Sequence, residues 1–573
     1  MNLKNLGLSM LAVAIVSMTG CASSSSKVVW KKPEKVVCRQ SGISSSVVVK
    51  ATDKDFHVMD GKGCFNSDNK MCDLRLYQIM VESFAHSDKG PKGYEKAWGP
   101  SVHGGNLRGI IENLDYIKST GVNTIWLTPI FETTGISDQE ESYDKLDGTG
   151  YYASNYFKID PKFGTLDDAK ELVTKAHNKG LYVIFDGVFG HAKINVEQNS
   201  PAGNKLHLNK MCRVMNGQLD KMSLRRATCF DIDKSLPFFK EVASYWIKTL
   251  KIDGWRLDQA YQLSPEQWKE ISKEVQIESA KKSNAYKMNG KKVQPLGYMV
   301  GEVWSGNARD IEKVAYQKDA LMSAFNFPVR YQLTKVLAIN GDVLDTQGCS
   351  QSAKVLNDEV NKMFGYSKNA MPNNFIGNHD LPRYGDLIQR AAYAEDGKKT
   401  KEYYDNHQAA FSFISAMSGP LTIYYGDEIG DDLEGFVEQP LQCDLKNQCD
   451  DHVARTTGRT SNFTKEEENL KASIATMLKL RDKHPALARG KRVTLFTDST
   501  LIVDLKQYNN DNVLYVFNSS TNSRKVSIDN SVWTKLNLGT CTLENLLTNE
   551  SLSANEFTVN GLSGSFFNVK CSK

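Results

Sequence analysis

The sequence has no long apolar run beyond its first twenty residues, little excess charge and few prolines. Its 573 residues carry Lys+Arg 71 against Asp+Glu 67, a net charge of +4, which argues against a nucleic-acid-binding protein that works by bulk charge. No downstream segment is long and apolar enough to predict a membrane span. With 40% hydrophobic and 24% charged residues, the composition excludes a mostly disordered chain and indicates several domains, or one large α/β barrel with additions.

The apolar run at the N-terminus predicts export. A short basic start precedes a mostly apolar stretch, residues 6–18, which is too short to span a bilayer. The motif Met18-Thr19-Gly20-Cys21 resembles a bacterial lipoprotein signal, which implies cleavage before Cys21 and lipid attachment to its thiol. We therefore expect residues 1–26 to be a signal peptide and Ser-rich tether, with the exported protein lipid-anchored to the outer membrane, facing either side. An ordinary signal peptide with an incidental cysteine is the alternative.

The cysteines support an oxidising compartment. Eleven minus Cys21 leaves ten, an even number. Four pairs are close enough in sequence to permit local disulfides: Cys64 and Cys72, Cys212 and Cys229, Cys443 and Cys449, Cys541 and Cys571. This leaves Cys38 and Cys349, and a bond between Cys38 and Cys64 is an alternative. The absence of a CxxC pair, and of histidines at ligand spacing, argues against a zinc site.

From residue 74 onward, short apolar runs alternate with segments of helical periodicity. The expected strands are Leu74–Val81, Thr124–Leu127, Leu181–Phe185, Gly254–Leu257, Tyr298–Gly301, Ala324–Phe327, Asn374–Ile376 and Leu421–Tyr424. The sequence Ser264-Pro265-Glu266-Gln267 is a helix start, with a capping hydroxyl, a proline and a glutamine at the third position. Eight strands that alternate with helices predict an α/β fold, a (β/α)8 TIM barrel, whose chemistry lies where the strands end.

Three stretches lie outside the barrel pattern. Residues 191–234 have little helical period and are predicted to be a small inserted domain after the third strand. The helical pattern stops after residue 487, and strand-like runs predict a C-terminal all-β domain, a β-sandwich, at 488–573. The barrel is therefore assigned to 74–190 and 235–487. Residues 27–73 form an N-terminal extension to which the sequence assigns no role.

Acidic residues follow four of the expected strands. They are Asp186, Asp258, Glu302 and Asp380, on the third, fourth, fifth and seventh strands. Strand ends share one mouth of a barrel, so we expect these carboxylates to converge there. The same mouth would receive three basic side chains, Arg256, His191 and His379. A pair of carboxylates that flank a bond suits glycoside hydrolysis, in which one is the nucleophile and the other a proton donor.

The motifs at these strand ends resemble those of the α-amylase family, glycoside hydrolase family 13. They are Asp186-Gly187-Val188-Phe189-Gly190-His191, Gly254-Trp255-Arg256-Leu257-Asp258, Gly301-Glu302-Val303-Trp304 and Phe375-Ile376-Gly377-Asn378-His379-Asp380. Each alone is a weak signal, but all occur in order within roughly residues 74–490. The resemblance implies the same barrel and a retaining mechanism.

The resemblance also implies a role for each acidic residue. Asp258 would be the nucleophile, and Glu302 would protonate the leaving oxygen and then activate water. Asp380 would hold sugar hydroxyls and favour ring distortion. Arg256 would keep Asp258 ionised, because a nearby cation favours the charged carboxylate, and Asp186 would support this arrangement without taking part in the chemistry.

The resemblance implies five substrate-binding residues, one of which is Arg256 beside the nucleophile. Tyr151 would stack on the sugar at the cleavage point, and His191 and His379 would hydrogen-bond that sugar. Arg383 would reach the next sugar. Asp186 would support Tyr151 as well as Arg256.

Three positions in two motifs depart from the family pattern. Gly190 stands where an Asn is usual, and Tyr261 and Gln262 stand where the family has Lys and His. In the family, that Asn and that His help to bind a calcium ion between the inserted domain and the barrel. Glycine has no side-chain oxygen, so this Ca²⁺ site looks incomplete. No cofactor is expected for the chemistry itself.

The resemblance implies hydrolysis of α-1,4-glucosidic bonds in starch, maltodextrin or related α-glucans. One alternative is an α-glucan transglycosylase or an α-1,6-acting enzyme of the same family, similar to pullulanase or cyclomaltodextrinase. A distant alternative is a non-catalytic glucan-binding lipoprotein, disfavoured because the three catalytic carboxylates are all present. The expected partners are an α-glucan and, through Cys21, a membrane, with no nucleic acid.

Overall fold

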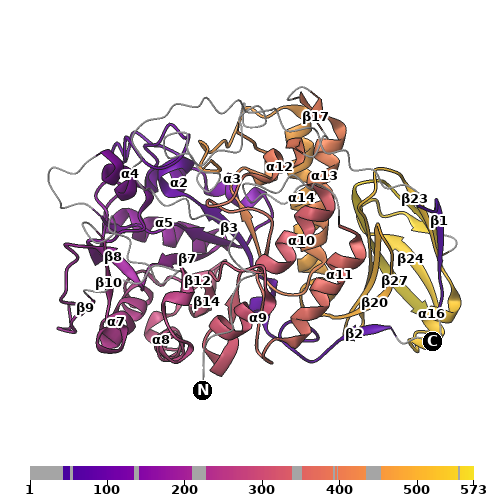
Figure 1. The fold of residues 1–573 in the computed structure, drawn as a ribbon, viewed down its shortest axis with the longest axis horizontal. Coiled ribbons are helices and arrows are strands. Elements are labelled where there is room, and N and C mark those ends of the chain that lie inside the picture. Colours follow the sequence, from indigo (N-terminus) through magenta and orange to yellow (C-terminus); the bar gives the residue numbers. More distant parts are fainter. Residues whose placement is uncertain are drawn as a thin grey trace, which may run out of the picture.

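The computed structural model describes residues 43–51, 56–133, 141–209, 227–338, 351–390, 394–395, 398–433, 453–552 and 555–572. A large part in which helices surround a central sheet lies beside a smaller all-β part, drawn in yellow, built mainly from the C-terminal residues (Figure 1).

A parallel eight-stranded sheet forms the centre of the large part. In chain order its strands are β3 (Arg75–Ile79), β4 (Thr124–Leu127), β7 (Tyr182–Gly187), β11 (Gly254–Leu257), β14 (Tyr298–Gly301), β15 (Ser323–Ala324), β16 (Asn374–Phe375) and β19 (Leu421–Tyr424). Each strand pairs with its neighbours in this order, and β19 pairs with β3. A parallel bridge between Phe325 and Asn373 joins β15 to β16 and closes the sheet. The predicted TIM barrel is confirmed.

The sixth strand differs from its predicted range. Residues up to Phe327 were expected to be extended, but β15 ends at Ala324, and Phe327 is the first residue of helix α10 (Phe327–Leu337). Pro328 explains the difference, because proline is favoured in the first turn of a helix, where no backbone N–H is needed.

Helices cover the outside of the barrel. Besides α10, they include α2 (Leu107–Glu112), α3 (Leu114–Ser119), α5 (Leu166–Asn178), α7 (Ile232–Leu250), α8 (Pro265–Ser279), α11 (Ala353–Lys362), α12 (Tyr384–Arg390), α13 (Lys401–Ala416) and α14 (Lys465–Lys483). Helix α8 begins with the predicted capping box of Ser264 and Gln267. Helix α7 begins at Ile232, within the range 191–234 assigned to the inserted domain, because the Asp231 side chain caps it. None of the helices in the described ranges is long and apolar enough to cross a membrane.

Between β7 and α7 lies a small antiparallel sheet. Its strands are β8 (His191–Lys193), β9 (Leu208–Asn209) and β10 (Ala227–Phe230), in the order β8-β10-β9. The Tyr156 hydroxyl donates to the carbonyls of Val188 and His191, at 2.6 and 2.9 Å. This fixes the chain where it leaves the barrel, and so fixes the start of β8.

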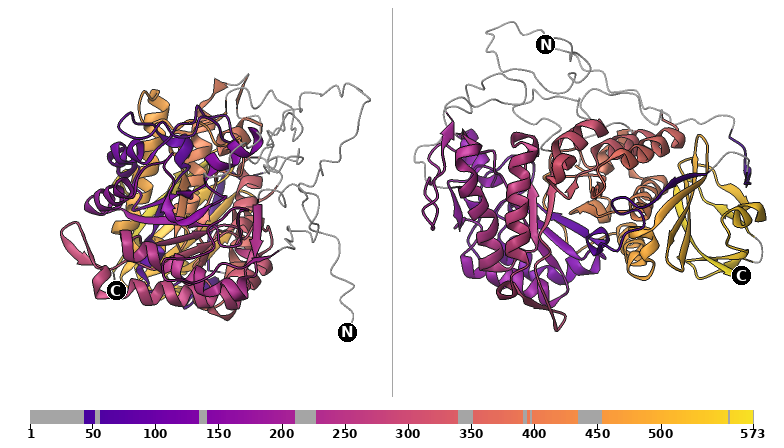
Figure 2. Two further views of the ribbon diagram at one scale, coloured as in Figure 1. Left: turned by 90° about the vertical axis from the view of Figure 1, so that its left-hand side faces the viewer. Right: turned by 90° about the horizontal axis from the view of Figure 1, so that it is seen from below.

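The smaller part is a sandwich of two sheets, as predicted for the C-terminal domain. The larger sheet contains, in spatial order, β2 (His57–Met59), β20 (Lys491–Thr497), β21 (Leu501–Tyr508), β22 (Asp511–Asn518), β27 (Ser563–Ser572), β24 (Thr540–Asn545) and β25 (Ser551–Leu552). The smaller contains β1 (Ser46–Val49), β23 (Arg524–Ile528) and β26 (Glu556–Val559). Helix α13 packs against β22 and β27, and lies between the barrel and the sandwich (Figures 1 and 2).

The N-terminal extension contributes to both sheets of this sandwich. Strand β1 pairs in parallel with β23, and β2 pairs antiparallel with β20. The two indigo strands lie against the yellow C-terminal part in Figure 1. The extension thus links the first described residues to the far end of the sequence, a role that the sequence did not reveal.

Two of the predicted disulfides are present, Cys64–Cys72 and Cys541–Cys571. The alternative pairing of Cys38 with Cys64 is therefore wrong. Cys229 is also disulfide-bonded. Its expected partner Cys212 lies outside the described residues, as do Cys21, Cys38, Cys349, Cys443 and Cys449.

Neighbouring valines in β1 test whether the extension stabilises the sandwich. Val49 is 1% exposed in the sandwich core, whereas Val48 is 54% exposed. We expect Val49→Ala to lower the free energy of unfolding by roughly 1.5 kcal/mol, because it removes about two buried methyl equivalents. The matched control, Val48→Ala, should change it by less than about 0.5 kcal/mol. Urea denaturation measures both, and equal losses would contradict the packing of β1.

Candidate active site

The predicted carboxylates converge at the carboxyl ends of the barrel strands. Asp186 lies near the end of β7, and Asp258 and Glu302 directly follow β11 and β14. His379 and Asp380 lie in the turn after β16. An open pocket with a volume of about 150 Å³ lies at this mouth. Its lining residues are Trp98, Leu146, Thr149, Tyr151, Tyr152, His191, Asp258, Gln259, His379, Asp380 and Arg455.

One buried guanidinium group joins three of these carboxylates. Nη1 of Arg256 lies 2.9 Å from both oxygens of Asp186 and 2.9 Å from Oδ1 of Asp258. Nη2 of Arg256 lies 2.9 Å from Oε2 of Glu302. Strand register produces part of this arrangement, because Arg256 and Asp186 are direct partners in the pairing of β11 with β7. The two candidate catalytic carboxyls are therefore held by the two ends of one cation.

Burial sets the proton affinity of this cluster. It raises the pKa of Asp258 to about 7 and that of Glu302 to about 8, while the positive charge of Arg256 opposes both shifts. Burial likewise raises the pKa of Asp186 to about 6. Glu302 therefore keeps its proton to a higher pH than Asp258. This is the order that a nucleophile and a proton donor require.

Tyr151 and His379 form one wall of the pocket. The Tyr151 hydroxyl donates to Oδ2 of Asp186 at 2.9 Å and lies 2.7 Å from Nε2 of His379. The two rings stack with a centroid separation of 5.3 Å and an interplanar angle of 7°. The Gln78 amide nitrogen lies 2.5 Å from Nδ1 of His379. With that nitrogen as donor, the ring proton lies on Nε2, which faces Oδ2 of Asp380 at 3.1 Å.

Arg455 is a pocket residue that the sequence did not reveal. Its Nη2 lies 2.7 Å from Oδ1 of Asp380, and its Nε donates to the His379 carbonyl at 3.0 Å. Arg455 thus forms an ion pair with Asp380 and fixes the turn that carries it. Arg455 follows the last barrel strand, in a segment that has no helical or strand periodicity and none of the motifs named above. The sequence around it therefore gave no indication of its role. Tyr152 also lines the pocket and was not predicted to do so. Its place next to Tyr151 in the chain could have indicated this.

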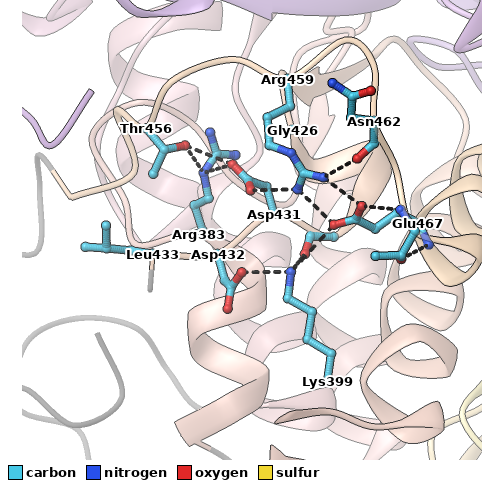
Figure 3. A network of polar contacts seen from close by, with 12 residues as sticks. Arg383, Lys399, Gly426, Asp431, Asp432, Leu433, Thr456, Arg459, Asn462 and Glu467 are labelled. Carbon is cyan, nitrogen blue, oxygen red and sulfur yellow. Dashed lines mark hydrogen bonds and ion pairs between the residues drawn. The ribbon is translucent and has the colours of Figure 1, made fainter. Parts of the chain in front are cut away.

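Arg383 does not lie where the resemblance placed it. Its side chain is fully buried and absent from the pocket lining. Its guanidinium donates to the Tyr425 carbonyl at 2.8 Å and lies 3.3 Å from Asp427. It also donates to Thr456 at 2.9 Å and lies 3.3 Å from Asp431 (Figure 3). The same figure shows Asp431 linked to Arg459, which in turn pairs with Glu467. The predicted sugar contact is corrected to a buried ion-pair network.

The space beside Gly190 is filled by the side chain of Gln262. A Cβ built on Gly190 would lie 1.8 Å from Oε1 of Gln262, so the Gln262 amide occupies the space that a side chain at 190 would need. Among the residues that the structure describes, no group of three or more His, Cys, Asp or Glu is arranged to hold a metal. The residues present at Gly190 and Gln262 therefore do not fit a calcium ion there.

Comparisons with known proteins agree with this geometry. The family model described as alpha amylase, catalytic domain, matches residues 78–207 and 233–490. A maltogenic alpha-amylase of Bacillus acidopullulyticus is 30% identical over 387 residues, 62% of this chain and 56% of that protein. This chain thus spans little more than half the length of that relative. A cyclomaltodextrinase of Thermoanaerobacter pseudethanolicus is 27% identical over 488 residues, 80% of this chain and 72% of that protein.

A solved structure extends the similarity over most of both chains. The crystal structure of AmyP in complex with maltose has 41% sequence identity and a TM-score of 0.77, and covers 87% of this chain and 97% of that one. The residues matched by the family model make up more than half of the chain and include the carboxylates at the pocket. From its barrel, its acidic strand ends and this match, the chain belongs to the alpha-amylase family of glycoside hydrolases, family 13.

Proposed function

We propose that this protein is a retaining hydrolase of short α-glucans, with cyclomaltodextrins and maltodextrins as substrates. The observation that carries the proposal is the bridge that Arg256 makes between Asp258 and Glu302 at the pocket. Retaining enzymes need two carboxyls about 5–5.5 Å apart. Contact with one guanidinium supports that close spacing.

Each side chain then has a distinct chemical task. Asp258, ionised beside Arg256, attacks the anomeric carbon and forms a glycosyl ester, while Glu302 gives its proton to the leaving oxygen. Glu302 next takes a proton from water, which attacks the ester and releases the sugar. Asp380, held by Arg455, accepts hydrogen bonds from sugar hydroxyls as the ring flattens toward the transition state.

The substrate class is supported by the relatives. The names of two relatives, a maltogenic alpha-amylase and a cyclomaltodextrinase, point to short or cyclic α-glucans, and AmyP binds maltose. Three aromatic side chains at the pocket, Trp98, Tyr151 and Tyr152, suit the apolar faces of glucose units. The second candidate is an endo-acting α-1,4-amylase of starch, and the third is glucosyl transfer to a sugar acceptor.

Product analysis distinguishes these candidates. We expect a cyclomaltodextrin and a linear maltooligosaccharide to be hydrolysed faster than soluble starch or pullulan, with products first appearing as the α-anomer by proton NMR. Asp258→Asn should nearly abolish turnover, because an amide cannot form the ester, whereas Asp115→Asn on the surface should not. Faster starch cleavage would favour the endo-amylase, products longer than the substrate would favour transfer, and fresh β-anomer would disprove retention.

The pH profile follows from the shifted acids. Glu302 must be protonated and has a pKa raised to about 8 by burial, so kcat/KM should fall as the pH rises through that value. Asp258 must be ionised and has a pKa raised to about 7, so kcat/KM should also fall below it.

In Glu302→Gln, the alkaline limb of this bell-shaped profile should disappear, and a substrate with a good leaving group should retain most of its rate. An alkaline limb that persists in Glu302→Gln would show that another group supplies the proton. Steady-state rates across the pH range measure both outcomes.

We further propose that Cys21 carries a lipid that anchors the protein to the outer membrane. The support is the sequence around Cys21 alone. In the bacterial host, the wild type should partition with membranes and incorporate labelled palmitate, and Cys21→Ser should do neither, while Ser25→Ala should behave as the wild type. Absence of label on the wild type would disprove the anchor.

A further inference from the structure

The side chain of Gln262 connects two loops of the active site. Gln262 ends the short 3-10 helix η2 (Ala260–Gln262), which follows Asp258 after β11. Its Oε1 lies 3.2 Å from Nδ1 of His191, and its Nε2 donates to Oε1 of Gln259 at 3.0 Å. One amide group therefore joins the start of β8, in the small inserted sheet, to the loop that carries the candidate nucleophile.

The His191 end of this connection fixes the state of the imidazole. An amide oxygen only accepts hydrogen bonds, so Nδ1 of His191 carries the proton. Burial lowers the pKa of His191, so the ring is neutral. Its Nε2 then lies 4.0 Å from Oδ2 of Asp258, oriented toward the place where the nucleophile meets the substrate.

The Gln259 end of the connection supports an unusual backbone. Gln259 has φ 41° and ψ 54°, in the left-handed region that a side chain disfavours by roughly 1–2 kcal/mol. In this conformation its backbone N–H donates to Oε2 of Glu302 at 3.0 Å. Gln262 holds Gln259 twice, through the side-chain bond and through its own N–H, which donates to the Gln259 carbonyl at 2.8 Å.

Gly190 is what allows Gln262 to lie there. A Cβ at position 190 would lie 1.8, 2.5 and 2.6 Å from Oε1, Cδ and Cβ of Gln262. Since Cβ is fixed to the backbone, rotation of the glutamine side chain cannot relieve the clash. These two departures from the family pattern are therefore one structural unit, because a glycine at 190 makes room for a glutamine at 262.

We propose that Gln262 is a positioning residue that takes the place of a bound cation, joining the inserted segment to the barrel and orienting His191 and Glu302 for catalysis. This inference rests on the proposed function for its kinetic consequences. Gln262 itself does not line the pocket. Its loss should therefore act on the chemical step and leave ground-state binding of the sugar almost unchanged.

The kinetic test uses an isosteric change. Gln262→Glu fits on Gly190 and still offers an acceptor to His191, but it cannot donate to Gln259. We expect kcat to fall roughly tenfold, as for the loss of one positioning hydrogen bond of about 1.4 kcal/mol, and KM to change by less than about threefold. The matched control is Gln294→Glu, an exposed glutamine whose side-chain amide donates to the Ala280 carbonyl at 2.6 Å. Wild-type kcat in Gln262→Glu would overturn the proposal.

The structural test is independent of activity. We expect Gly190→Ala to lower the melting temperature of the wild type strongly, but to have little further effect in a Gln262→Gly background, because the clashing atoms are then gone. This non-additivity is the signature of direct contact between the two positions. If the losses in melting temperature are additive, the two positions are not in direct contact.

The proposal that Gln262 takes the place of a cation can be tested separately, by changing the calcium concentration. Excess EDTA or added calcium should leave both the melting temperature and kcat of the wild type unchanged. If added calcium raises both the melting temperature and kcat, the proposal that Gln262 replaces a cation is wrong. A wild type that hydrolyses no glucan would remove the proposed function, while the melting-temperature cycle would still decide whether Gly190 and Gln262 act as one unit.

Discussion

The active site depends on the single positive charge of Arg256 among the buried carboxylates Asp186, Asp258 and Glu302. Without that cation, the burial of three neighbouring acids would keep them protonated or separate them. With it, one carboxyl can ionise while another keeps its proton. The register of β7 and β11 places Arg256 beside Asp186, and the ends of β11 and β14 bring Asp258 and Glu302 to its two nitrogens. The fold therefore determines the chemistry through this one side chain.

A second cation completes the site from a different part of the chain. Arg455 holds Asp380 and the His379 carbonyl, and Tyr151 connects His379 to the Asp186 that Arg256 also binds. Four strand ends and two loops are thus linked by one continuous polar network. Because each acid has a fixed donor, little reorganisation is required when a substrate enters, which is how electrostatic preorganisation lowers a barrier.

Sequence reasoning succeeded where the signal was local. The strands Thr124–Leu127, Gly254–Leu257, Tyr298–Gly301 and Leu421–Tyr424 have the predicted bounds, because each is a short apolar run whose ends are marked by loop residues. It failed where a partner is distant. Nothing near residues 46–59 indicates that they pair with β23 and β20, and nothing near Arg455 indicates Asp380. Arg383 was misplaced because a motif gives the position of a residue, but not the direction of its side chain.

The departures at 190 and 262 show how a missing ligand can be read wrongly from sequence. Taken one at a time, Gly190 is the loss of an oxygen ligand and Gln262 is the loss of a histidine, so the sequence indicated a weakened calcium site. In the structure the two changes depend on each other, since the glutamine amide fills the volume that the glycine leaves. An ion joins two loops by charge and coordination, and an amide does so by donating at one end and accepting at the other. The amide adds no net charge beside the four acids, so the proton affinities of Asp258 and Glu302 are set by burial, by Arg256 and by the neighbouring acids.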